Sequence, residues 1–528
     1  MKRFFLLVLC IFATSCTGGG SCAGKKEVAA LPDTFIWNLY SDPKSIDPGL
    51  VQENSGSDVG VQLFEGLTEY HPETNEPVPA LATSSDVSSD GLLYTFHLRQ
   101  DAKWSNGDPV TAHDFEYSWK RALDPKTGSY YASYFYIIKG GQEFNEGKNT
   151  DGNSVMVKAL DDVTLQVTLK HPAHYFPQMI AYPAYRPVHR KTVETFGDKW
   201  THPEHIVSNG PYKLVSWEVQ KEMVAEKNPY YWDAQNVRIN RIRFLLIEER
   251  ETALKKHLEG SAHYTDDIPT LKIPTLKSNP HYHDAIQLAT YYYSINTKKK
   301  PFDDVRVRQA LAMSIEREKI TNVLQQGYPT RNLVPPGIPG YTTAKGLSFN
   351  PEKARQLLSE AGFQDPKTLK VTLSYNTNEN HKLIAEMVQN MWKENLGVEA
   401  ELYNQEWKSH LKNVEEGNYE VGRFTWIGDY VDPLTFLEIT TTASTQNYSK
   451  WRNPVYDDLV LVQSGKERDP KKRFELLQQA EEMMLEQAPL IPLYHYGRPL
   501  LLDPRVKGFY GNLQDMHPVK FAWFEEEK

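Results

Sequence analysis

Hydrophobic and polar positions follow two different periods along the chain, and together they predict a mixture of strands and helices. Apolar Tyr94, Phe96 and Leu98 alternate with polar neighbours, the period of two that is typical of a half-buried strand. Residues 398–403 repeat this alternation. Because strand-like and helix-like pieces alternate over the whole body of the chain, the pattern favours an α/β or α+β fold with mixed sheets.

The segment around residues 111–125 carries the signals of a complete helix. Thr111 and Asp114 have the spacing of a capping box, and Asp124-Pro125 provides a stop. Between these signals, small or apolar residues recur at helical spacing: Phe115, Ser118, Trp119 and Ala122. We therefore expect a helix that packs one face inward.

Two later segments show the same logic. Asp303 or Asp304 can cap a helix with an inward face made of Val307, Ala310, Leu311 and Ser314. A second stripe ends at Gly397, where a left-handed C-cap favours glycine, and consists of Leu383, Met387, Val388 and Met391. We interpret the two methionines as core packing.

The first residues have the pattern of an export signal. Two basic residues precede a short apolar stretch at 4–13, which is too short to cross a bilayer comfortably. Ala13-Thr14-Ser15-Cys16 resembles a bacterial lipobox, although Ala13 stands where Leu is usual. We expect residues 1–16 to be a signal peptide, Cys16 to be lipidated, and residues 17–27 to form a flexible tether. A plain secretory signal is the alternative.

Composition excludes several classes of protein. The chain has 528 residues, of which 40% are hydrophobic and 24% charged, as in ordinary soluble proteins. Its net charge of −9 and lack of a basic stripe argue against nucleic acid as a partner. All three cysteines lie in the first 22 residues, so the body can hold neither a disulfide framework nor a thiol-based active site.

The sequence shows no catalytic motif. Phosphate-binding loops, a Gly-x-Gly-x-x-Gly fingerprint, His-Glu-x-x-His and Gly-x-Ser-x-Gly are all absent. His281 and His283 could ligate a metal if a third ligand came from elsewhere, but Pro280 and polar neighbours favour a solvated loop. We therefore predict no catalytic residue, no cofactor and no metal site.

One segment, residues 423–433, stands out because an apolar strand leads into Asp429, with Trp426 and Tyr430 beside it. A carboxylate in such a place is costly to bury unless a cation meets it. Arg423 could be that cation within the protein, and the ammonium group of a ligand could be it from outside. The residues alone leave both possibilities open.

Seven short motifs occur in the order found in a known family, and the chain resembles that family. It comprises the periplasmic solute-binding proteins of peptide ABC importers (family 5), which include the oligopeptide-binding proteins. The motifs are LFEGL at 63–67, YTFHLR at 94–99, AKWSNG at 102–107, SNGPY at 208–212, PFDDVRVR at 301–308, NQEWK at 404–408 and PLYHY at 492–496. This resemblance covers nearly the whole exported chain. It implies an α/β fold in which two hinged lobes close over a ligand, with an inserted third domain.

The resemblance also implies where the lobes divide. The first ligand-binding lobe would take residues 28–65, 176–290 and 498–528. The inserted lobe would be residues 66–175, and the second ligand-binding lobe residues 291–497.

The site residues implied by the resemblance surround an extended peptide. Asp429 would pair with the peptide's α-ammonium group, and the backbone of residues 423–427 would pair with the peptide as an added strand. The remaining positions are Trp407 and Trp426 in side-chain pockets, Tyr131 and Tyr496 near the N-terminal end, Arg423 and His381 toward the C-terminal carboxylate, and Glu53 as a cleft acid. Glu53 lies in Val51-Gln52-Glu53-Asn54, where relatives carry Val-Pro-Glu-Ser.

The function implied is capture of oligopeptides and their delivery to the permease of an ABC transporter, without cleavage. We expect a monomer in the periplasm, held to a membrane only by its lipid anchor. Narrower specificity for murein tripeptide, dipeptide or another small solute is an alternative. A secreted hydrolase and a surface adhesin on the same fold are remote ones.

Overall fold

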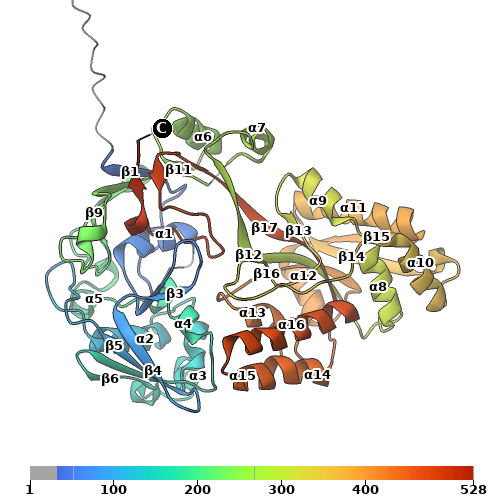
Figure 1. Ribbon diagram of the computed structural model, residues 1–528, viewed down its shortest axis with the longest axis horizontal. Helices are drawn as coiled ribbons and strands as arrows, with labels where there is room; N and C mark the ends of the chain where they lie inside the picture. Colours follow the sequence, from blue (N-terminus) through green and yellow to red (C-terminus); the bar gives the residue numbers. More distant parts are fainter. Residues whose placement is uncertain (1–31, 52, 267, 527–528) are drawn as a thin grey trace, which may run out of the picture.

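The computed structural model describes residues 32–51, 53–266 and 268–526, and it shows two large lobes joined by two long strands (Figure 1). The predicted signal peptide, Cys16 and the tether lie outside the described residues. The crossing strands are β12 (Tyr282–Ile295) and β17 (Leu490–Leu502), which pair antiparallel over most of their length. Among the described residues, no helix is long and apolar enough to cross a membrane.

The crossing strands are part of one mixed sheet that extends into both lobes. Its order is β15-β14-β16-β12-β17-β11-β1-β10-β9-β8, with β13 paired to β17 off this path. The bounds are β1 Thr34–Asn38, β8 Tyr212–Glu218, β9 Glu222–Lys227, β10 Arg241–Leu245, β11 Tyr264–Thr265, β13 Tyr328–Pro329, β14 Lys370–Asn376, β15 Glu399–Gln405 and β16 Val421–Ile427. The predicted α/β class with mixed sheets is confirmed.

A separate four-stranded antiparallel sheet forms the lower part of the first half in Figure 1, in the order β4-β5-β7-β6. Its strands are β4 Ala82–Val87, β5 Leu93–Leu98, β6 Val157–Asp161 and β7 Thr164–Thr168. Strand β5 buries Tyr94, Phe96 and Leu98, as the alternation predicts. Short pairs β2 (Thr68–Tyr70) with β3 (Pro77–Pro79), and β18 (Val506–Lys507) with β19 (Trp523–Phe524), complete the sheets.

Helices cover these sheets, and the predicted start signals hold. Helix α2 (Ala112–Leu123) begins with the capping box of Thr111 and Asp114 and buries Phe115, Trp119 and Ala122. The others in the first half are α1 Asn54–Leu63, α3 Gly141–Asn145, α4 Phe176–Met179, α5 Arg190–Phe196, α6 Arg250–Leu258 and α7 Ile273–Leu276. In the second lobe they are α8 Val305–Met313, α9 Arg317–Leu324, α10 Pro351–Glu360, α11 Glu379–Leu396, α12 Trp407–Glu415, α13 Leu434–Leu437, α14 Pro454–Asp457, α15 Ser464–Lys466 and α16 Pro470–Gln487.

The cap of α8 and the buried face of α11 differ in detail from the predictions. Asp304, rather than Asp303, caps α8, since its side chain accepts a hydrogen bond from the N–H of Arg306. The predicted stripe of α11 is displaced by part of a turn: Leu383 and Met387 are only half-buried, while the buried face includes Ile384, Ala385, Val388, Met391 and Trp392. The buried face is centred closer to Trp392, which is fully buried and donates from its indole N–H to the carbonyl of Leu311. Gly397 ends the helix at φ 78°, as expected.

An ion pair deep in the second lobe fixes the segment that follows β16. Arg473 of α16 donates to both carboxylate oxygens of Asp432, at 2.6 and 2.9 Å, and both side chains are almost fully buried. The same carboxylate accepts the N–H of Leu434 at the start of α13. This pair therefore holds the turn between β16 and α13 against the helical side of the lobe.

Replacing Arg473 with Met should lower the free energy of unfolding of this lobe by about 3–5 kcal/mol, because Asp432 would be left buried without a cation. Chemical denaturation measures the change. The double variant Arg473→Met with Asp432→Leu should recover most of the loss. A single variant that costs less than about 1 kcal/mol would contradict this role.

Candidate functional site

The free edge of strand β16 is the centre of the candidate site. One edge of β16 pairs with β12 along its whole length, from Ile427 opposite Ala289 to Val421 opposite Ile295. The other edge pairs with β14 only at Val421 and Gly422. The N–H of Gly428 donates to the carbonyl of Leu288 in β12, so even-numbered residues direct their backbone groups toward β12. The backbone groups of Thr425 and Ile427 therefore point to the open edge, where another extended chain can pair with them.

Asp429 lies just beyond this edge and has no cationic partner among the described residues. Its Oδ1 accepts a hydrogen bond from the hydroxyl of Tyr134 at 2.9 Å, and its own N–H donates to Oγ1 of Thr435 at 3.0 Å. Burial raises the pKa of Asp429, and the hydrogen bond from Tyr134 only partly opposes this. Arg423, considered above as an internal partner, does not reach it.

Arg423 is a buried guanidinium that contacts only neutral groups within the described chain. It donates to Oδ1 of Asn376 at 3.2 Å, to Oγ1 of Thr425 at 2.5 Å and to the hydroxyl of Tyr496 at 3.2 Å. It also stacks over the ring of Tyr291, 4.7 Å from the centroid. An arginine that is only 8% exposed and lacks a carboxylate is poised to receive an anionic group.

His381 completes this group, since its ring lies 5.6 Å from that of Tyr291. Burial, with added repulsion from Arg423 and His410, lowers the pKa of His381 to about 3. Its Nδ1 is buried without a hydrogen-bond partner. The structure thus brings Arg423, Tyr496 and His381 together around Tyr291, with the histidine neutral.

The two tryptophans lie on the opposite face of β16. Trp426 alternates with Arg423 and Thr425 along the strand, is half-buried, and has an indole N–H without a partner. Trp407 is 46% exposed at the start of α12, and its ring lies 6.3 Å from His410, which in turn packs against Phe424. A chain paired with the free edge would direct its side chains alternately to these two faces.

Tyr131 reaches the site indirectly. Its ring packs edge-on against Tyr134 and Tyr182, with centroids 5.0 and 5.1 Å away. Tyr134, three residues later in the same turn, is the residue that contacts Asp429. The aromatic cluster therefore brings the region of residues 130–182 against the second lobe beside the free edge of β16.

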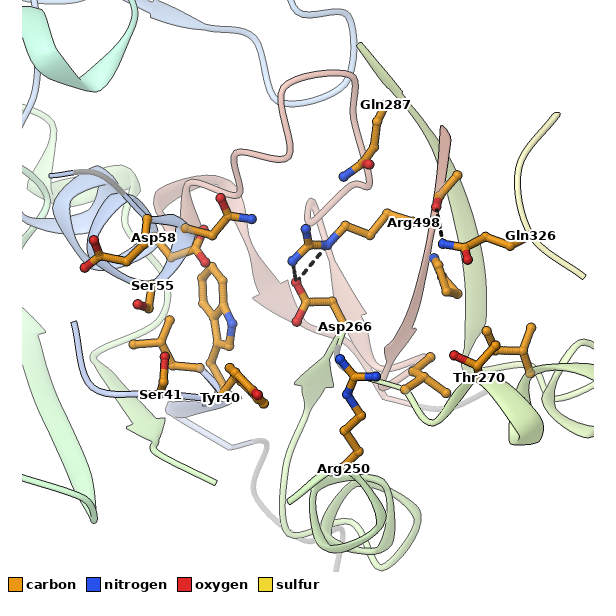
Figure 2. A pocket seen from close by; sticks show the side chains of 18 residues that line it. Tyr40, Ser41, Ser55, Asp58, Arg250, Asp266, Thr270, Gln287, Gln326 and Arg498 are labelled. Carbon is orange, nitrogen blue, oxygen red and sulfur yellow. Dashed lines mark hydrogen bonds and ion pairs between the residues drawn. The ribbon is translucent and has the colours of Figure 1, made fainter. Parts of the chain in front are cut away.

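Glu53 lies apart from the other seven candidates and lines a cavity of about 580 Å³ beside the crossing strands (Figure 2). We call this space the hinge cavity. Its lining consists of Trp37, Leu39, Tyr40, Ser41, Glu53, Asn54, Ser55, Asp58, Arg250, Asp266, Ile268, Thr270, Ile273, Gln287, Gln326, Gly497, Arg498 and Pro499. The Oε1 atom of Glu53 accepts the N–H of Lys44 at 2.7 Å, while Oε2 is buried without a partner. No contact among the described residues joins Glu53 to Asp429 or Arg423.

Comparison with known proteins identifies the family. Residues 76–448 match the model of "Bacterial extracellular solute-binding proteins, family 5 Middle". The chain belongs to this family. It is 37% identical to the oligopeptide-binding protein OppA of Bacillus subtilis, over 95% of both chains. It is 38% identical to the periplasmic oligopeptide-binding protein OppA of Salmonella typhimurium, over 96% of this chain and 94% of that one.

Solved structures of the family agree in fold and also indicate the lobe arrangement. The unliganded open form of the murein tripeptide-binding protein MppA superimposes with a TM-score of 0.88 at 36% identity, over 94% of this chain and 98% of that one. Haemophilus influenzae OppA in complex with the peptide RPPGFSPFR gives 0.68 at 33% identity, over 93% and 99%. This family 5 protein therefore has its lobes arranged much as in the open form.

Several residues of the site were not predicted from the sequence of this family 5 protein. Tyr134, Tyr291, Thr425 and His410 carry its key contacts, and His410 Nε2 lies 3.0 Å from the carbonyl oxygen of Arg423. Thr425 could have been predicted from the sequence, because strand alternation places it on the same face as Arg423. Tyr291 follows from it, since Tyr291 is its partner in β12. His410 and Tyr134 had none, since only the tertiary fold brings them to the edge.

The histidine pair considered for metal binding has a different environment from the one expected. His281 Nδ1 lies 2.8 Å from Nε2 of His257, and His283 is in strand β12 rather than in a solvated loop. Burial is the main cause that lowers the pKa of His257 to about 4. No group of three or more His, Cys, Asp or Glu in the described part of the chain could hold a metal ion.

The imidazole of His381 should stay neutral from pH 8 down to about pH 4, because its pKa is lowered to about 3. NMR of imidazole-labelled protein measures this, and the variant His381→Gln assigns the resonance. As pH falls below the ordinary value of about 6.5, the unfolded chain takes up this proton first, so His381 contributes to acid lability. A midpoint above pH 5 for the assigned resonance would contradict the buried, cation-flanked environment.

Proposed function

We propose that this chain is an extracytoplasmic solute-binding protein that captures oligopeptides between its lobes and delivers them to an ABC transporter. The observation that carries the proposal is a pair of opposite charges without ionic partners, Asp429 and Arg423, beside a free strand edge. A peptide supplies what each lacks: an α-ammonium group for Asp429, a carboxylate for Arg423 and a backbone for the edge.

The spacing of the two charges suits a short extended peptide. Arg423 and Asp429 are six positions apart, about 20 Å along an extended chain. A peptide of about three to five residues spans roughly 10–18 Å, and the side chains of Arg423 and Asp429 cover the remainder. Main-chain pairing with Thr425 and Ile427 makes no demand on the peptide's side chains, which supports binding of many sequences.

Closure of the lobes is part of this proposal. The likeness to the open form of MppA supports an open starting state in which the free edge is accessible. A bound peptide would draw the two lobes together, with β12 and β17 bending as the hinge. Accordingly we propose that the lobes divide in these strands, with residues 28–65, 176–290 and 498–528 on one side, 291–497 on the other, and 66–175 as the inserted lobe.

The remaining parts of the proposal concern location and partners. Relatives named as periplasmic oligopeptide-binding proteins support a site of action outside the cytoplasm. We propose that the chain acts as a monomer, is anchored through a lipid on Cys16 and docks on permease subunits. Murein tripeptide, dipeptide or another small solute with an ammonium group would use the same carboxylate, so these narrower ligands belong in any panel of tested compounds.

Replacing Asp429 with Asn should weaken trialanine binding at least about tenfold, because a charge-assisted hydrogen bond is worth about 1.5–3 kcal/mol. Isothermal titration calorimetry measures the affinity, and the exposed Asp198→Asn is a matched control. N-acetyl-trialanine should bind the wild type weakly and lose little more in the variant. Equal affinities of wild type and Asp429→Asn for trialanine would rule out the ammonium role.

Peptides should be bound without being cleaved, because among the described residues of the site Asp429 is bonded to a phenol and Nδ1 of His381 has no partner, so neither activates a serine or threonine hydroxyl there. Prolonged incubation with a mixed tripeptide pool, followed by mass spectrometry, should return intact peptides. Fragments that accumulate in proportion to protein concentration, and that disappear with Asp429→Asn, would instead indicate a hydrolase.

A further inference from the structure

A histidine closes one end of the free edge of β16. Nε2 of His410 lies 3.0 Å from the carbonyl oxygen of Arg423, and the side chain of His410 is fully buried. A carbonyl oxygen only accepts hydrogen bonds, so Nε2 carries the proton and donates it. Arg423 directs its backbone groups to the same edge as Thr425 and Ile427. The contact therefore occupies an acceptor that a chain paired along this edge would otherwise use.

The ring of His410 is held in place by its own neighbours. It packs against Phe424 and Trp407, with 5.6 and 6.3 Å between ring centroids. Its Nδ1 lies 3.4 Å from Oε1 of Gln405, the last residue of β15. Helix α12, which carries the histidine, lies beside β16 (Figure 1). A peptide could displace this ring only by breaking these contacts.

The part of the edge that remains open is short. On one side of Arg423, strand β14 already pairs with Val421 and Gly422. On the other side, no backbone group of the described chain pairs with the outward groups of Thr425 and Ile427. The open edge therefore consists of two outward-facing residues, and it ends at His410.

The length of the open edge sets how many peptide residues can pair. With its ammonium group toward Asp429 and its carboxylate toward Arg423, a peptide runs antiparallel to β16. Hydrogen-bonded pairs then recur at every second residue, so the first peptide residue lies opposite Ile427 and the third opposite Thr425. A fifth residue would lie opposite Arg423, where the imidazole ring of His410 already stands. Regular pairing therefore ends with the third residue.

The guanidinium group of Arg423 also favours a chain that ends there. Its Nη2 atom donates to Oγ1 of Thr425 at 2.5 Å, so the group lies beside the position opposite the third peptide residue. A carboxylate on that residue reaches the cation and forms a charge-assisted hydrogen bond. A longer peptide presents a neutral amide at the same place.

We propose that His410 limits the length of the bound peptide, because it closes the edge of β16 after the third peptide residue and so favours tripeptides over longer peptides. The inference rests on the proposed function and deepens it by naming the class of ligand. His410 acts through the carbonyl of Arg423 and is a positioning residue. Because it restricts only the main chain, the preference for length leaves the side chains of the peptide free.

Methylation of the peptide backbone tests the register in the unmodified protein. Isothermal titration calorimetry would compare pentaalanine with forms that are N-methylated at the third or at the fifth residue. Methylation at the third residue removes the donor to Thr425 and should weaken binding about fivefold, whereas methylation at the fifth should change the affinity by less than about twofold.

Variants test the histidine itself. The wild type should bind trialanine at least about tenfold more tightly than pentaalanine. In His410→Ala this ratio should fall about fivefold, because the freed carbonyl accepts the fifth N–H, and methylation of the fifth residue should then weaken binding. His410→Gln retains a donor and should keep the wild-type ratio, as should the exposed control His113→Ala.

The outcomes separate this inference from the proposed function. If none of the peptides binds the wild type, the proposed function fails. If the peptides bind, but trialanine and pentaalanine do so equally or His410→Ala leaves their ratio unchanged, the length limit is overturned while peptide capture stands. Thermal unfolding checks that His410→Ala is folded. The methylated peptides need no variant, and a fifth-residue methyl group as harmful to the wild type as a third-residue one would also overturn the limit.

Discussion

The site depends on two charges of opposite sign, a buried arginine and a half-buried aspartate, that the protein does not neutralise internally. Burying either a carboxylate or a guanidinium without a partner is unfavourable, and proteins usually avoid it by pairing the two. Here Arg423 contacts an amide, two hydroxyl groups and an aromatic ring, and Asp429 contacts one phenol. Their separation along one strand prevents them from pairing with each other. The resulting electrostatic cost can be relieved by a ligand with both charges.

The surrounding structure keeps these two groups apart. Strand β16 is fixed on one side by its full register with β12, and the turn after it is held by the ion pair of Asp432 with Arg473. His410 bonds the carbonyl oxygen of Arg423 on the open side, beyond the last pairing of β16 with β14. The same elements that prevent collapse of the charges therefore leave the backbone of Thr425 and Ile427 available.

Local features were predictable from the sequence because they depend on neighbours in the chain. The capping box at Thr111, the glycine cap at Gly397 and the alternation in β5 belong to this group. The partner of Asp429 was not predictable. The side chain of Arg423, six residues earlier, could fold back onto Asp429 or lie about 20 Å away along an extended strand. Only the bounds of the strand decide between these two arrangements. Tyr134 was missed in favour of Tyr131 because both occupy one turn, and the packing of distant segments selects between them.

The hinge cavity was beyond sequence analysis for the same reason. Its charged residues come from α1 and its N-cap, α6, the segment after β11 and strand β17, and no local pattern links them. Within the proposed function, recognition depends on the backbone and on the two terminal groups of the peptide. The free edge and its terminal charges recognise features common to all peptides, so they contribute affinity without selecting side chains.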